Sequence, residues 1–169
     1  MEYIPWAALA ALASDQLDDR LLAELWRQVG VLHAHRIAHH DLGGWSVVVD
    51  ERLHPWLVDF DVSEAMADSP ELANDVTELL IALARSVGPQ RALAGALASL
   101  GPEVVGAALQ QSDPSRFAMQ TRNDLRADPA LWDDLRRQAT AGQSSPGGAG
   151  PADHVGPGPA STEERQLGS

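Results

Sequence analysis

The chain has 169 residues and a mass of 18.0 kDa, which allows one compact domain. It carries 24 acidic and 12 basic side chains, and the resulting charge of −12 argues against non-specific binding to nucleic acid or to an anionic lipid surface. Every basic residue is arginine, which excludes mechanisms that need the chain's own lysine, among them a Walker-type phosphate loop and a Schiff base. The absence of cysteine excludes disulfides, thiolate zinc sites and cysteine nucleophiles.

The apolar stretches are shorter than the about 20 residues that span a bilayer. The first residues also lack the basic segment that opens a signal peptide. We therefore expect no membrane insertion and a cytoplasmic protein.

The composition changes abruptly after Ala139. Residues 140–169 hold half of the chain's 14 glycines and four of its 11 prolines. Such a segment buries too little apolar surface to offset the entropy that ordering costs. We predict a folded part over residues 1–139 and a disordered tail over residues 140–169.

Periodicity predicts a mainly helical fold with one small β-hairpin. A helix signal begins at Ser14-Asp15, and leucines at three- and four-residue spacing continue it to about His33. Short β-branched and aromatic runs at Val47–Val49 and Trp56–Val58 predict the two strands of the hairpin. The rest is predicted to be helical, with helices over about 69–87, 90–100 and 103–110 and further starts at Asp113-Pro114 and Asp128-Pro129.

Tryptophan positions give a first prediction of the core. Trp26, Trp56 and Trp132 have apolar neighbours in the sequence, and we expect them to pack inside the protein.

The candidate chemistry lies between the first helix and the end of the second strand. The chain reads His39-His40-Asp41 in a predicted loop and Asp59-Phe60-Asp61 after the hairpin. Because a hairpin brings its two ends together, we expect Asp41 and Asp59 to share one cleft. Two carboxylates in one cleft suit magnesium-dependent phosphoryl transfer, in which one accepts a hydroxyl proton and the other holds the metal.

This segment resembles the catalytic core of protein-kinase-like phosphotransferases, the superfamily that includes aminoglycoside phosphotransferases and lipopolysaccharide kinases. Its members read H-x-D-x-x-x-x-N, then a hairpin, then D-F-G or a close variant, and His39-His40-Asp41 and Asp59-Phe60-Asp61 have matching spacing. The runs at 36–41 and 55–60 look most similar to a kinase-like domain that precedes a flippase-like membrane region in actinobacterial proteins. The resemblance covers roughly residues 10–139 and implies a kinase-like C-lobe.

The resemblance also implies roles for individual residues. Asp41 would be the catalytic base, Asp59 the magnesium ligand and His39 a brace for the loop, while Asp75 would anchor the loop through its backbone amides. Mg²⁺ and ATP are the implied cofactors. Trp45, in the loop before the first strand, is a candidate to stack on the adenine, to plug the nucleotide site or to pack under the hairpin.

Departures from the family pattern predict weak or absent activity. Ser46 replaces the asparagine that supplies the second metal ligand, and Gly43 replaces a lysine or other helper. Asp61 replaces the glycine of the last motif, a change that aminoglycoside-type members tolerate. Only 40 residues precede Asp41, and they include no Gly-rich strand pair and no lysine to clamp ATP. The pattern therefore predicts a C-lobe without an N-lobe, a degenerate or truncated phosphotransferase with little or no activity of its own.

Three alternatives stay open. In the first, the chain is an active Mg-ATP phosphotransferase that a partner's N-lobe completes. In the second, it is a protein-interaction module that binds a protein on its N-lobe-facing surface. In the third, His33, His35, His39 and His40 hold zinc in a metal-dependent hydrolase, although Gly43-Gly44 would break the helix that such a His-Asp pair requires.

Overall fold

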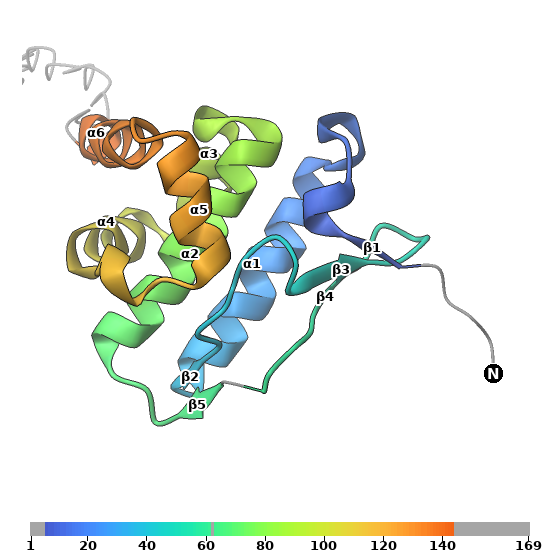
Figure 1. Cartoon of the computed structure of the whole chain (residues 1–169), viewed down its shortest axis with the longest axis horizontal. Helices are drawn as coiled ribbons and strands as arrows, with labels where there is room; N and C mark the ends of the chain where they lie inside the picture. Colours follow the sequence, from blue (N-terminus) through green and yellow to red (C-terminus); the bar gives the residue numbers. More distant parts are fainter. Residues whose placement is uncertain (1–5, 62, 144–169) are drawn as a thin grey trace, which may run out of the picture.

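The computed structural model describes residues 6–61 and 63–143, and it is mainly helical with a small β part, as predicted (Figure 1). Two antiparallel sheets accompany the helices, one of three strands in the order β1-β3-β4 and one that pairs β2 with β5. The helices are α1 (Asp19–Ala34), α2 (Ser69–Val87), α3 (Pro89–Leu100), α4 (Pro102–Gln111), α5 (Met119–Ala127) and α6 (Leu131–Gln143). The strands are β1 (Ala7–Ala8), β2 (Ile37–Ala38), β3 (Val47–Val49), β4 (Pro55–Leu57) and β5 (Glu64–Ala65).

Helix α2 is the centre of the fold. It packs against α3, α4 and α5, and its middle is buried on every side, including the polar residues Asn74, Asp75, Thr77 and Glu78. The helix begins at Ser69, as predicted, and the residue that caps it is Asp68. Asp68 accepts a hydrogen bond from the amide of Glu71, and the Glu71 carboxylate accepts one from the amide of Asp68, which together form a capping box.

Helix α1 lies between the helical bundle and the three-stranded sheet, and it contacts both α3 and β4 (Figure 1). Its predicted start at Ser14 is wrong, because Ser14–Gln16 forms a short 3-10 turn and the α-helix begins at Asp19. Asp18 is the true cap, since its Oδ1 accepts a hydrogen bond of 2.8 Å from the amide of Leu21. The cluster of acids in this region predicted a helix start but not which acid caps it.

The core contains two of the three predicted tryptophans. Trp26 is fully buried, and Trp132 packs edge-on against Phe117 with 5.7 Å between ring centroids. The prediction for Trp56 is wrong, because its side chain is 46% exposed. It lies on the edge strand β4 next to buried Pro55, and alternate strand residues face opposite sides. Its Nε1 donates to Asp50 at 3.3 Å.

Several elements differ from the predicted ones. The predicted helix start at Asp113-Pro114 forms only a 3-10 turn, Pro114–Arg116, and the α-helix of this region, α5, begins at Met119. The two-residue strands β1, β2 and β5 are too short to show a period. Helix α6 continues through residues 140–143, so the predicted tail does not begin at 140. The remainder of that tail, residues 144–169, lies outside the described residues.

Across the described ranges, no single helix has both the length and the apolar composition for crossing a membrane. Helices α3 and α4 meet those criteria only as a pair, and they are bent by 117° at the break between them.

Candidate functional site

The Asp41 loop, residues 39–46, connects β2 to β3, and Asp75 of α2 fixes its beginning. The fully buried Asp75 carboxylate accepts a hydrogen bond of 2.6 Å from the amide of His39 and one of 2.9 Å from the amide of His40. The imidazole Nε2 of His33, in the last turn of α1, lies 3.4 Å from the same carboxylate. A buried carboxylate needs such partners, because burial without them costs several kcal/mol. One side chain of the central helix therefore holds the loop.

A second acid of α2, Glu78, holds the loop further along the chain. It is 1% exposed, and its carboxylate accepts hydrogen bonds from the amide of Leu42 at 3.3 Å and from the amide of Ala118. Burial raises the pKa of Glu78 to about 8, and the nearby negative charges of Asp75 and Asp41 add to the rise. Sequence reasoning missed Glu78. The sequence could have indicated this role, because Glu78 follows Asp75 by three residues and both acids therefore lie on one face of the helix.

His39 connects the Asp41 loop to the segment that follows β4. Its side chain is buried, its Nε2 lies 2.9 Å from the carbonyl oxygen of Val58, and its ring packs 4.7 Å from the ring of Phe60. A carbonyl oxygen can only accept, so Nε2 donates the hydrogen in this contact. The buried Nδ1 has no hydrogen-bond partner among the described residues.

Asp41 and Asp59 are connected through these neighbours. His39 precedes Asp41 by two residues and contacts Val58 and Phe60, which flank Asp59 in the sequence. Asp41 is half-buried and Asp59 is exposed. That the two carboxylates share one cleft stays a prediction.

The backbone adopts unusual angles on both sides of this contact. His40 has a φ of 67° and Asp59 a φ of 66°, in the left-handed region that costs a non-glycine residue about 1 kcal/mol or more. Such conformations persist where the surroundings hold them, and the His40 amide is held by Asp75. Strained residues are frequent at functional sites, which makes this junction the best candidate site in the chain.

Ser46 does not fit the predicted role of metal ligand. Its side chain is 5% exposed, and its hydroxyl donates to the carbonyl oxygen of Gly43 at 2.9 Å. Its backbone carbonyl accepts the amide of Val58, which closes the end of the hairpin. Ser46 therefore stabilises the turn, and Asp59 is left as the one predicted magnesium ligand with an exposed oxygen.

Trp45 points away from the packed interior. It is 60% exposed, which excludes the expectation that it packs under the hairpin. It lines a cavity of about 370 Å³ together with Gly44, Arg85 and Asp124, on the α2–α5 side of the loop. Neither Asp41 nor Asp59 lines that cavity, so adenine stacking by Trp45 stays a prediction without support from this geometry.

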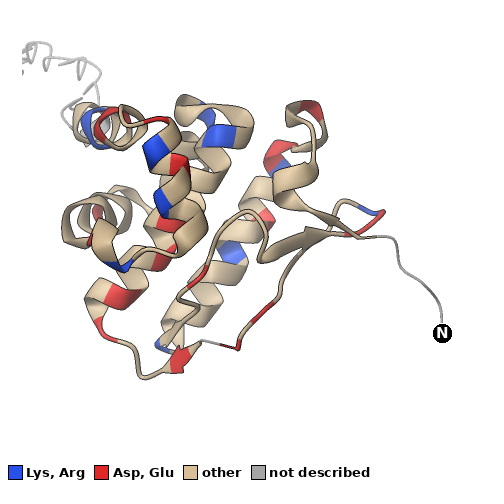
Figure 2. Ribbon diagram, in the orientation of Figure 1, with Lys and Arg blue, Asp and Glu red and all other residues tan. Residues whose placement is uncertain are grey.

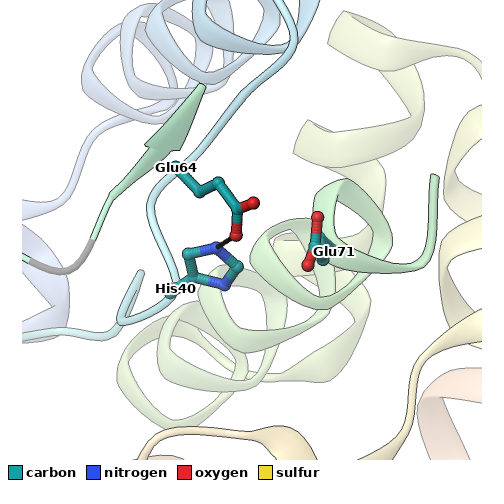
Figure 3. Close-up of side chains that lie close together, drawn as sticks. All are labelled: His40, Glu64 and Glu71. Carbon is teal, nitrogen blue, oxygen red and sulfur yellow. Dashed lines mark ion pairs between the residues drawn. The ribbon is translucent and has the colours of Figure 1, made fainter. Parts of the chain in front are cut away.

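The four neighbouring histidines do not gather into one zinc site. His33 pairs with Asp75, His39 binds the Val58 carbonyl, and the Nδ1 of His35 lies 2.9 Å from the Val31 carbonyl at the end of α1. His40 has a different environment, because its ring lies beside the carboxylates of Glu64 and Glu71 (Figure 3).

Comparison with known proteins assigns no family and no function to the chain. No family model matches the chain, and no curated protein matches it either. Its function must therefore be argued from the site itself.

Proposed function

We propose that this chain is a degenerate kinase-like phosphotransferase domain that keeps the scaffold of the catalytic loop but has little or no activity alone. The observation that carries the proposal is the bonding of Asp75 to two consecutive amides at the start of the Asp41 loop. The resemblance described above implies this contact for an aspartate at this position of the central helix. His39 adds a second link, because it holds the loop against the segment that contains Asp59.

In such a domain Asp41 would accept the proton of a substrate hydroxyl, and Asp59 would hold Mg²⁺. The ion, when bound, neutralises charge on the phosphate oxygens. Mg²⁺ is commonly held by one or two carboxylates together with substrate phosphates, so Asp59 fits this role in part. The proposal includes a cytoplasmic location.

Two features support low activity. Ser46 is buried and its hydroxyl donates to the Gly43 carbonyl within the turn, which makes it a poor candidate for the second oxygen ligand. In the described part of the chain, β1, two short 3-10 turns, α1 and β2 precede the loop, and none of them supplies a lysine. Phosphoryl transfer depends on positioned charges around the phosphates, so a weak metal site and the lack of a lysine favour a low rate enhancement.

Calorimetric titration of the full chain with ATP, with and without Mg²⁺, tests the proposal. We expect no measurable binding at millimolar ATP. Micromolar, magnesium-dependent binding that is lost in Asp59→Asn and kept in Glu51→Gln would overturn it and favour an active phosphotransferase. Glu51 is a suitable control, because it is an exposed acid in the turn between β3 and β4.

A protein-interaction module is the second candidate function, and a set of exposed aromatic side chains favours it. Exposed tryptophan and phenylalanine are enriched at protein interfaces. We expect Trp45→Ser combined with Trp56→Ser to reduce any self-association seen by sedimentation velocity. A wild-type chain that stays monomeric and captures no partner in a pull-down would contradict this function. The side chains concerned are Trp6 (48% exposed), Trp45 (60%), Trp56 (46%) and Phe60 (41%).

A further inference from the structure

Three potential metal ligands from separate segments meet beside the Asp41 loop. His40 follows β2, Glu64 lies in β5 and Glu71 is in the first turn of α2 (Figure 3). One ligand atom of each lies within 4.8 Å of the others. We propose that these three side chains bind a first-row divalent ion of the zinc class, in a site separate from the magnesium position expected at Asp59. This inference does not depend on the proposed function.

The spacing of the donors is suitable for such an ion. The Nε2 of His40 lies 3.4 Å from Oε2 of Glu64. Zinc binds imidazole nitrogen and carboxylate oxygen at about 2.0–2.2 Å, and two ligands of a tetrahedral ion are then about 3.4 Å apart. These two side chains already have the separation that the ion requires. The Glu71 carboxylate has to move closer, and because a carboxylate oxygen has more than one lone pair, it can bind the ion and still accept the amide of Asp68.

The backbone around the site is fixed before any ion binds. Asp75 holds the amide of His40, and the capping box with Asp68 holds Glu71. Glu64 of β5 pairs with Ala38 of β2, and Ala38 precedes His40 by two residues, so the strand pair places Glu64 near His40. Ligands on a rigid scaffold lose little entropy on binding, which favours affinity.

Ligand chemistry selects the class of ion. An imidazole nitrogen suits Zn²⁺, Co²⁺ or Ni²⁺ much better than Mg²⁺, which prefers oxygen ligands in an octahedral arrangement. One neutral imidazole and two carboxylates balance the charge of a divalent ion. Figure 2 shows further acidic residues between β4 and the start of α2, which attract a cation to this face. Three protein ligands leave one position of a tetrahedral ion for water.

Arg116 competes with the ion for Glu71. Its Nη2 lies 3.4 Å from Oε1 of Glu71, and its side chain is 49% exposed. An exposed ion pair of this kind is much weaker than a metal-ligand bond. Removal of the arginine charge should therefore strengthen metal binding. A metal site that did not include Glu71 would not respond to this change.

Once bound, the ion would connect β5 and the start of α2 to the Asp41 loop. The segment after Asp59 would then be held by its β5 end in addition to its contact with His39. The site would thus stabilise the same junction that contains the two predicted functional acids.

Metal titration of the chelator-treated full chain tests the inference, with Zn²⁺ followed by calorimetry and Co²⁺ by its visible absorption. We expect one ion per chain with micromolar or tighter affinity and a four-coordinate cobalt spectrum. Glu64→Gln and His40→Gln should each weaken binding at least tenfold, and Arg116→Gln should tighten it. Glu51→Gln and His35→Gln, an exposed acid and an exposed histidine outside the cluster, should bind as the wild type does.

Wild-type affinity weaker than about 100 µM would overturn the inference, since proteins bind zinc far more tightly than that at dedicated sites. Unchanged affinity in Glu64→Gln would overturn it as well. The Glu64 side chain is 58% exposed, so this variant keeps the fold and answers the question even if His40→Gln is unstable.

Discussion

Replacement of Glu78 by glutamine should change how stability depends on pH. Glu78 is 1% exposed and its pKa rises to about 8 from an ordinary value of 4.5. Between these two values the folded protein keeps the proton and the unfolded chain releases it. Stability therefore falls as pH rises through this window, by about 1.4 kcal/mol per pH unit. The whole window corresponds to roughly 4–5 kcal/mol from this one group.

Glutamine resembles the protonated acid in shape and has no charge. Glu78→Gln should be less stable than the wild type by about 1–3 kcal/mol near pH 5, because its amide nitrogen cannot accept one of the two backbone amides bonded to Glu78, and this deficit should shrink or reverse near pH 8.5. Urea unfolding at several pH values measures the difference, and Glu51→Gln is the matched control with an exposed carboxylate. Parallel stability profiles for wild type and Glu78→Gln would show that burial does not raise the pKa of Glu78.

Three further substitutions test the packing around the site by their effect on the free energy of unfolding. Asp75→Asn removes one acceptor oxygen from two buried amides and should cost about 1–3 kcal/mol by urea denaturation; no loss would mean that water replaces the contact. Asp68→Ala removes the cap of α2 and should cost about 1 kcal/mol in thermal unfolding, against no change in Ser69→Ala. Trp26→Ala empties a fully buried site and should cost about 3–5 kcal/mol, and a cost below 1 kcal/mol would contradict its place in the core.

Local signals in the sequence predicted the elements that depend on local chemistry. The run Val47–Val49 is strand β3, and helix α2 has the predicted bounds 69–87, because β-branched residues and a proline-marked start act over a few residues. The predicted start of α1 and the predicted burial of Trp56 were wrong. Which acid caps α1, and which residues of strand β4 face the core, are decided by packing and not by the local sequence.

Contacts in the candidate site were harder to predict for the same reason. The resemblance to phosphotransferases drew attention to Asp75 and to the Asp41 loop. Glu78 and the cluster of His40, Glu64 and Glu71 join segments far apart in the chain, and no periodicity or motif spacing describes such an approach. Ser46 illustrates another difficulty, because the sequence does not show that this residue is buried and that its hydroxyl donates to the Gly43 carbonyl.

The central claim is that the Asp75 carboxylate anchors the Asp41 loop through two backbone hydrogen bonds, and amide hydrogen exchange tests it most directly. The amides of His39 and His40 should exchange as slowly as those in the middle of α2, because both are bonded to a fully buried carboxylate. Exchange at the rate of an exposed loop would show that Asp75 does not anchor this segment and would contradict the account.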